Sequence, residues 1–422
     1  MAGLTERRWR VQHFRSRACP YVTQAVEQIT GRPGRHLDPW LMGDNLLREL
    51  FSRGARHADL AVVEGTLEPR RPAPDRSLYN CPGDLSQIVD VLGLPKIALV
   101  PCACLRDLHV PRVPDGIDAV LLDGVEDRHE YELLRQSVSM VLRKPVVGAV
   151  EALPEIRAAL RDAPREHLLP ADLYERLGAS FLRFADLAAL RSLAESAATP
   201  PFVDEPRARA PRLFRIAYAQ DEAFGGYLPD TLETLESLGA ELVEFSPLRD
   251  EALPEAVDLV MIGCGHPDRF ADALAENLSL ITALRAHVCR GHRIYSEGGG
   301  TAYLGRNLIL RDRRVPAAGI LPFDAELLDD PTPPAPVSRV LLRDSWLGAR
   351  GTIVRGYRSG RWRLQPAPEP DGCPGRSGPL TSQRDIYFRH HAVGSLIHLH
   401  LLALPEFVSA FADPHLPSLS LS

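Results

Sequence analysis

The sequence predicts an α/β fold made of two doubly wound domains, and three observations lead to this prediction. The chain has 422 residues, too many for one hydrophobic core and suited to two domains. Short β-branched runs alternate with helical periodicity, which is typical of parallel sheets covered by helices. The alternation stops at a Pro- and charge-rich stretch and then starts again. We therefore expect domains at 1–197 and 213–422, joined by a linker at 198–212.

The elements of the first domain follow from its apolar runs. Strands are expected at 9–14, 58–65, 95–102, 117–124 and 145–150, because each is a short, bounded run of buried type. Apolar residues at helical spacing lie between these runs, and residues 151–196 are Leu/Ala-rich and predict further helices.

The second domain repeats this order. Strands are expected at 213–220, 241–247, 258–265 and 293–297, and helices at 228–240 and 268–291. Pro/Gly-rich segments at 325–338 and 366–380 predict loops on either side of further β-structure. The C-terminal part predicts a strand that leads into a final helix.

Composition and charge disfavour some classes of protein function. The formal net charge of -6 does not favour a nucleic-acid-binding protein, and no stretch reaches the roughly 18 apolar residues of a membrane span. The seven cysteines have irregular spacing without a CxxC pair, which indicates reduced thiols in a cytoplasmic protein. On a strand, the side chains of Cys102 and Cys104 would face the same way. They would then be either metal ligands or buried thiols, and we assign no metal ligand.

The segment 293–304, RIYSEGGGTAYL, predicts a strand, a tight turn and a helix start. Glycines in such a turn permit the sharp bend of a nucleophile elbow, which exposes one side chain at the end of a sheet. An ordinary strand-turn-helix connection explains the pattern equally when the segment is read alone. The position that an elbow reserves for its nucleophile is Gly298.

Six segments carry a resemblance to a known family: residues 30–42, 58–65 and 92–100 in the first half, and 221–277, 293–304 and 394–400 in the second. Together these segments resemble the cobyrinic acid a,c-diamide synthase family. The resemblance implies a P-loop-NTPase-like (dethiobiotin-synthetase-like) domain and a flavodoxin-like class I glutamine amidotransferase domain. It also implies that ATP phosphorylates a corrin side-chain carboxylate, and that ammonia released from glutamine by a Cys–His pair displaces the phosphate.

The glutaminase residues implied by the family are only partly present. The family pattern Glu-Cys-Gly-Gly corresponds here to Glu297, Gly298 and two further glycines, and His398 matches the catalytic histidine. We expect His398 to be a remnant without a thiol, or a hydrogen-bonded residue at a strand end. Gly263 and Gly265 match the oxyanion loop. Because such a loop contributes N–H groups, Cys264 between them is not expected to replace the nucleophile.

Some of the residues that bind ATP and Mg²⁺ in the family are also missing here, so we assign no cofactor to this chain. No Gly-rich loop ends in Lys-Ser/Thr, and the resemblance begins at the family's second strand, so the phosphate-loop unit lies outside this sequence. The acidic stretch expected at 18–23 has no carboxylate, and a Pro/Arg loop follows residue 65. Arg35, Asp38 and Glu64 are retained and are the ligand-binding candidates, although a helix N-cap role explains Asp38 equally.

These losses predict a catalytically degenerate homologue that is retained for binding. Its ligand would be a corrin or another tetrapyrrole, or its partner a protein such as a second copy or an intact homologue. The alternative is an active ATP-dependent amidoligase of corrin biosynthesis that uses free ammonia.

Overall fold

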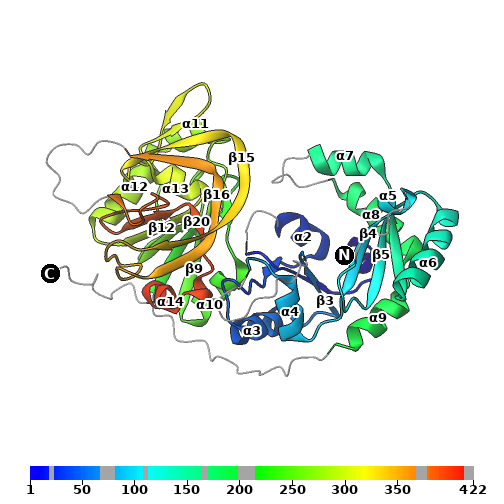
Figure 1. Cartoon of the computed structure of the whole chain (residues 1–422). Coiled ribbons are helices and arrows are strands. Elements are labelled where there is room, and N and C mark those ends of the chain that lie inside the picture. Colours follow the sequence, from blue (N-terminus) through cyan, green and yellow to red (C-terminus); the bar gives the residue numbers. More distant parts are fainter. Residues whose placement is uncertain are drawn as a thin grey trace. The chain divides into compact units, whose positions relative to one another are not determined.

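The computed structural model describes residues 1–18, 23–66, 81–107, 113–162, 170–197, 214–366 and 378–412. The chain divides into two compact units, unit 1 with Met1–Arg17 and Tyr21–Asp204, and unit 2 with Ala18–Pro20 and Glu205–Ser422 (Figure 1). The expected linker lies outside the described residues. So do most of the stretch expected to have lost its carboxylates, most of the Pro/Arg loop and residues 367–377 of the loop expected at 366–380. At the two ends of that range, Pro366 and Gly378–Pro379 belong to strands.

Unit 1 alternates strands with helices, as predicted. Its strands are β1 (Val11–Arg15), β2 (Arg35–His36), β3 (Leu60–Glu64), β4 (Ile97–Pro101), β5 (Ala119–Val125) and β6 (Val146–Glu151). Its helices are α1 (Ala2–Glu6), α2 (Thr23–Thr30), α3 (Asp44–Ala55), α4 (Leu85–Leu92), α5 (Cys102–Arg106), α6 (Arg128–Leu142), α7 (Pro154–Asp162), α8 (Ala171–Phe184) and α9 (Leu187–Glu195).

The strands of unit 1 form two parallel sheets rather than one continuous sheet. One has the order β2-β1-β3 and the other β4-β5-β6. The core beside β4-β5-β6 contains Val120, Leu122 and Ala149, packed with Val138 of α6 and Phe184 of α8.

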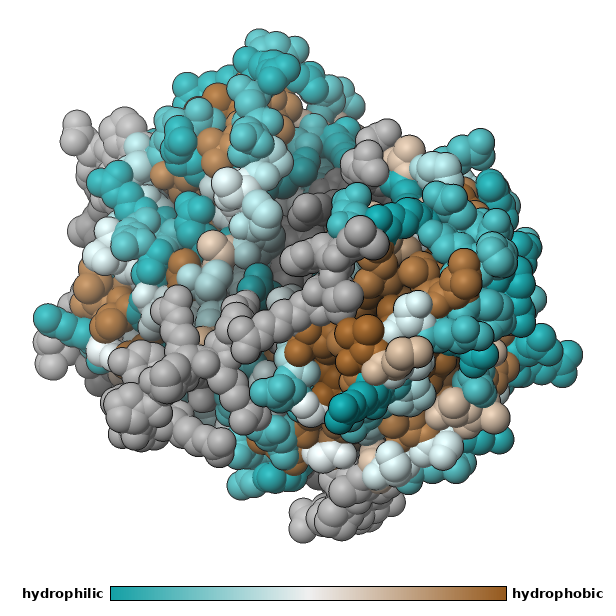
Figure 2. Space-filling view, turned by 45° about the vertical axis from the view of Figure 1, so that its right-hand side comes forward, coloured by the Kyte–Doolittle hydropathy of each residue, from teal (hydrophilic) through white to brown (hydrophobic). Residues whose placement is uncertain are grey.

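Apolar side chains also reach the surface of unit 1. Leu99 of β4 is 60% exposed, and Ile97 on the same strand and Met140 of α6 are exposed as well. Figure 2 shows brown, hydrophobic areas among the teal surface. Among the described residues no helix is both long and apolar enough to cross a membrane.

Unit 2 contains a longer series of elements. Its strands are β7 (Phe214–Ala219), β8 (Phe224–Gly226), β9 (Ala240–Phe245), β10 (Leu259–Ile262), β11 (Cys264–Gly265), β12 (Arg293–Glu297), β13 (Asn307–Ile309), β14 (Arg314–Pro316), β15 (Phe323–Val340), β16 (Ile353–Pro366), β17 (Gly378–Pro379), β18 (Ile386–Arg389), β19 (Ala392–Ser395) and β20 (Ile397–His398). Its helices are α10 (Pro229–Ser237), α11 (Ala271–Glu276), α12 (Leu278–Cys289), α13 (Gly299–Leu304), a short 3-10 turn (Leu401–Ala403) and α14 (Pro405–Ala412).

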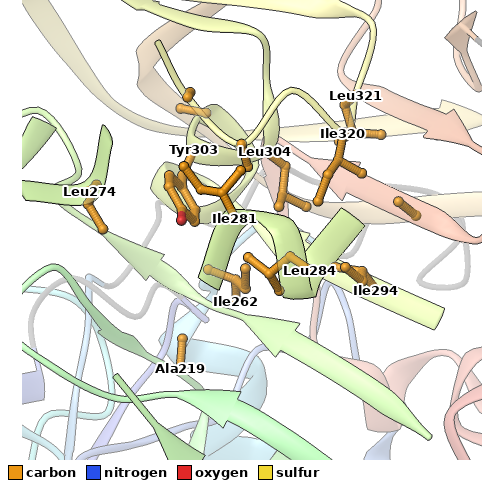
Figure 3. Close-up of a cluster of buried hydrophobic side chains, with 14 of the residues drawn as sticks. Ala219, Ile262, Leu274, Ile281, Leu284, Ile294, Tyr303, Leu304, Ile320 and Leu321 are labelled. Carbon is orange, nitrogen blue, oxygen red and sulfur yellow. The ribbon is translucent and has the colours of Figure 1, made fainter. Parts of the chain in front are cut away.

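The main sheet of unit 2 has the order β17-β18-β19-β12-β10-β7-β9, in which β19, β12, β10, β7 and β9 run parallel. A large apolar core lies against it: Ile281 and Leu284 of α12 face Ile262 and Ile294 on the strands, and Tyr303 of α13 lies beside them (Figure 3). The opposite cluster includes Leu259, Val393 and Phe407. The prediction of an α/β, doubly wound architecture is confirmed.

The prediction of a loop at 325–338 is wrong. These residues belong to β15, which pairs antiparallel with β16 in a second sheet of order β14-β13-β15-β16-β20. The register of this pair shifts between Leu327 and Thr332 and again between Thr332 and Ala335. A proline has no backbone N–H to donate to the neighbouring strand. It is tolerated at such irregularities because fewer hydrogen bonds join the two strands there.

Candidate functional site

The predicted elbow is present in unit 2. β12 ends at Glu297, Gly298 has φ 51° and ψ −114°, and α13 begins at Gly299. This positive φ is strained for residues with a side chain, and nucleophile elbows hold their nucleophile in a strained turn of this kind. Gly298 therefore keeps the turn and has no side chain with which to react.

The elbow packs directly against the loop that follows β10. A Cβ on Gly299 would lie 2.2 Å from the carbonyl oxygen of Gly265, and a Cβ on Gly265 would lie 1.9 Å from the carbonyl oxygen of Ala223. These positions admit only glycine unless the backbone shifts. Cys264 and Gly265 form β11, which pairs antiparallel with β8.

This arrangement brings three functional side chains together. Cys264 Sγ lies 2.9 Å from His398 Nδ1, and His398 Nδ1 lies 3.5 Å from Glu297 Oε2. Cys264 and His398 are each 1% exposed. The expectation that His398 has no thiol beside it is wrong, because β11 and β20 bring the two side chains together.

Tyr295 and the backbone hold the carboxylate of Glu297 in place. The Tyr295 hydroxyl donates to Glu297 Oε1 at 2.6 Å, and the Leu399 N–H donates to the same oxygen at 3.2 Å. Burial raises the pKa of Tyr295 well above its ordinary value, so the phenol stays protonated and remains a donor. The other carboxylate oxygen, Oε2, is thereby directed at His398.

The three groups are arranged differently from those of a Ser-His-Asp triad. In a triad the nucleophile and the orienting carboxylate contact different nitrogens of the imidazole ring. Here the thiol and the carboxylate both approach Nδ1. A sulfur, a nitrogen and an oxygen therefore converge on one point, and all three ligand atoms lie within 4.8 Å of one another.

A small pocket lies beside this cluster, within unit 2. Its walls include Tyr227, Gly263, Tyr295, Glu297 and Leu399. The Gly263 N–H donates to the Tyr227 hydroxyl at 3.0 Å. That N–H is therefore engaged within the protein, and the oxyanion role implied for Gly263 and Gly265 stays a prediction.

Glu64 in unit 1 belongs to a separate polar cluster at the carboxyl ends of β1 and β3. Its Oε2 lies 3.0 Å from His13 Nε2, and its Oε1 lies 3.7 Å from the Arg15 guanidinium. The hydrogen bond from His13 is the main cause that lowers the pKa of Glu64. Ligands of open α/β sheets bind at the carboxyl ends of strands, which is where Glu64 lies.

Asp38 does not cap a helix, so that expectation is wrong. Its Oδ1 accepts from the Trp40 N–H at 3.1 Å and from the Gly83 N–H at 3.2 Å. Helix α3 begins six residues later at Asp44, with Gly43 as its N-cap. The buried carboxylate of Asp38 fastens the turn before α3 to the segment before α4. Arg35, the other candidate, is buried on β2.

The cysteine pair of unit 1 also differs from the expectation of a strand. Cys102 and Cys104 lie in helix α5, so they do not face the same way as they would on a strand. Burial raises the pKa of Cys102 to about 11, which keeps it a neutral thiol.

The contact between Cys264 and His398 could not be predicted from the sequence, because the two residues lie 134 residues apart. The one available signal was a cysteine inside a glycine-rich segment that matched a functional loop.

Known proteins resemble this chain along most of its length. Residues 215–403 match the CobB/CobQ-like glutamine amidotransferase domain. The chain is 30% identical over 376 residues to the cobyrinate a,c-diamide synthase of Salmonella typhimurium, with 84% of this chain and 80% of that protein covered. It is 31% identical over 353 residues to the enzyme of that name from Magnetococcus marinus, with 78% and 74% covered. For that of Syntrophotalea carbinolica the identity is 28% over 435 residues, with 98% and 93% covered.

Proposed function

The chain belongs to the cobyrinate a,c-diamide synthase family, and we propose that it is a member that binds a corrin or a related tetrapyrrole without releasing ammonia from glutamine. The observation that carries the proposal is Gly298, which occupies the elbow in the strained backbone conformation but has no nucleophilic atom. Amide hydrolysis through a thioester needs a thiolate at that point.

The contact between Cys264 and His398 does not argue for a displaced nucleophile. Cys264 is 1% exposed, so a glutamine side chain has little access to its sulfur. Its base, His398, has the carboxylate of Glu297 on the same nitrogen rather than on the opposite one. In a Ser-His-Asp triad the carboxylate and the nucleophile instead contact opposite nitrogens of the ring.

The proposal predicts that the purified chain releases no ammonia from glutamine above the level of a Cys264→Ser variant. Ammonia release by a coupled assay measures this, with a cobyrinate a,c-diamide synthase from a relative as the positive control. Glutamine hydrolysis that disappears in Cys264→Ser would overturn the proposal, since it would make Cys264 the nucleophile.

Binding is tested separately by titrating the chain into cobyrinic acid and following the absorbance of the corrin. Saturable binding with a constant stoichiometry is the expected result, and no spectral change at any protein concentration would refute it. Gly298→Cys is expected to leave amidation absent, because no phosphate loop is present in this sequence.

One observation favours a second function, an amidoligase that uses ATP and free ammonia. Glu64 is retained at the carboxyl end of β3, and the hydrogen bond from His13 lowers its pKa, which favours the ionised carboxylate. Release of ADP that depends on the corrin, with Mg²⁺ and ammonium present, would support this function. Under the main proposal no such release occurs.

A further inference from the structure

We propose that Cys264, His398 and Glu297 form a site for one zinc ion. This inference goes beyond the proposed function, which does not need a metal. The three residues are far apart in the sequence, and the fold brings their side chains together.

The ligand types select the metal. A thiolate, an imidazole nitrogen and a carboxylate are all zinc ligands, whereas Mg²⁺ and Ca²⁺ prefer oxygen atoms alone. Zinc sites with three protein ligands leave a fourth position for water or another molecule. Of the three proposed ligands, Glu297 also lines the neighbouring pocket, together with Gly263 and Leu399.

The distances are close to those of a tetrahedral site. With zinc bonds of about 2.0–2.3 Å, neighbouring ligand atoms lie about 3.3–3.7 Å apart. His398 Nδ1 and Glu297 Oε2 are already 3.5 Å apart. Cys264 Sγ and Nδ1 are 2.9 Å apart, which is shorter than in a zinc site, so the proposal requires the sulfur to move away from the ring when the ion binds.

The surroundings of the carboxylate support this role. Metal ligands are commonly held in orientation by a second layer of hydrogen bonds. Tyr295 and the Leu399 N–H both donate to Glu297 Oε1, which leaves Oε2 for the ion.

Charge also favours a divalent ion at this point. Binding converts the Cys264 thiol to a thiolate, and its proton leaves to solvent while a sulfur–zinc bond forms. The thiolate and the carboxylate then carry two negative charges that Zn²⁺ neutralises. Buried charges need such compensation, and both Cys264 and His398 are buried.

Cobalt(II) is the probe for the test, because thiolate ligation to Co²⁺ gives a charge-transfer absorption band in the near ultraviolet. The full chain is stripped with a chelator and titrated with Co²⁺. We expect one equivalent to bind with a charge-transfer band and tetrahedral d–d bands, and Zn²⁺ to displace it.

Matched variants locate the site. Cys264→Ser should lose the charge-transfer band, and Glu297→Gln should weaken binding about tenfold or more. Cys289→Ser is the control, because Cys289 is exposed on α12 and should leave the band unchanged. Circular dichroism checks that each variant is folded.

Thermal unfolding gives an independent measurement. Zinc should raise the Tm of the wild type and of Cys289→Ser but not of Cys264→Ser, because a ligand stabilises only the form that binds it. Absence of a charge-transfer band in the folded wild type, or a band that survives Cys264→Ser, would overturn the proposal. Neither result depends on glutamine hydrolysis or corrin binding.

Discussion

His287 is a buried imidazole in α12 whose burial lowers its pKa from 6.5 to about 4. Its Nε2–H donates to the Arg293 carbonyl at 3.2 Å, which the neutral ring can do. Between pH 6.5 and 4 the unfolded chain binds a proton at this residue and the folded chain does not. The contribution to stability is therefore complete above pH 6.5 and is lost as the pH falls toward 4, by about 3 kcal/mol.

Replacing His287 by Gln tests this effect, because an amide N–H can donate to the same carbonyl but does not titrate. The free energy of unfolding of His287→Gln should fall less between pH 7 and pH 4 than that of the wild type. Urea denaturation at several pH values measures it. Parallel pH profiles for the two proteins would show that His287 titrates normally.

At the same scale, the candidate site shows which residues could be predicted from the sequence. The elbow and His398 could be predicted, since each lies in a local motif. The thiol beside His398 could not, because the contact depends on a two-residue strand, β11, and its pairing with β8. The conformation of Gly298 follows from local glycine chemistry, whereas the direction in which the Cys264 side chain points depends on tertiary packing.

At the scale of elements, Asp385 ties the β15–β16 hairpin to the segment before β18. Its two carboxylate oxygens each accept a hydrogen bond at 2.7 Å, one from Arg339 on β15 and one from Arg358 on β16. The Asp385 side chain is 2% exposed. Asp385→Ala leaves two partly buried arginines without their carboxylate and should lower the free energy of unfolding by about 3–5 kcal/mol.

Asp329→Ala, on β15, is the matched control. Its pair with Arg311 is exposed on both sides, so the variant should unfold at nearly the same denaturant concentration as the wild type. Chemical denaturation followed by circular dichroism compares the two variants. An equal decrease in the free energy of unfolding for both variants, or a decrease below about 1 kcal/mol for Asp385→Ala, would contradict a structural role for this network.

Elements were predictable where their periodicity was strong. The strands of both units lie close to the expected ranges, because continuous apolar runs with helical partners determine a parallel sheet. Strands β3 and β4 are less buried than their apolar runs predict. The strand β15 was missed because its prolines predict a loop, and only the partner strand β16 and the register shifts allow an extended backbone there. The separation of unit 1 into two sheets could not be predicted either. Whether β3 pairs with β4 depends on tertiary packing and not on the local sequence, and in the structure the two strands belong to different sheets.

At the scale of the whole molecule, the chain contains separate hydrophobic cores. The cluster around Leu122 consists only of residues from unit 1, and the cluster around Leu284 only of residues from unit 2. Both leucines are 0% exposed. A chain with independent cores is not expected to unfold in one all-or-none step.

We therefore expect two transitions in calorimetry, each sensitive to one core. Leu122→Ala and Leu284→Ala should each destabilise their own unit by about 2–5 kcal/mol, because both remove buried methyl groups from a packed core. Leu122→Ala should lower only one transition temperature and Leu284→Ala only the other. If both variants shift a single transition by the same amount, the two cores are energetically coupled and the units fold as one. Exposed Leu99→Ala serves as the control and should move neither transition, since little of that side chain is removed from water in the folded chain.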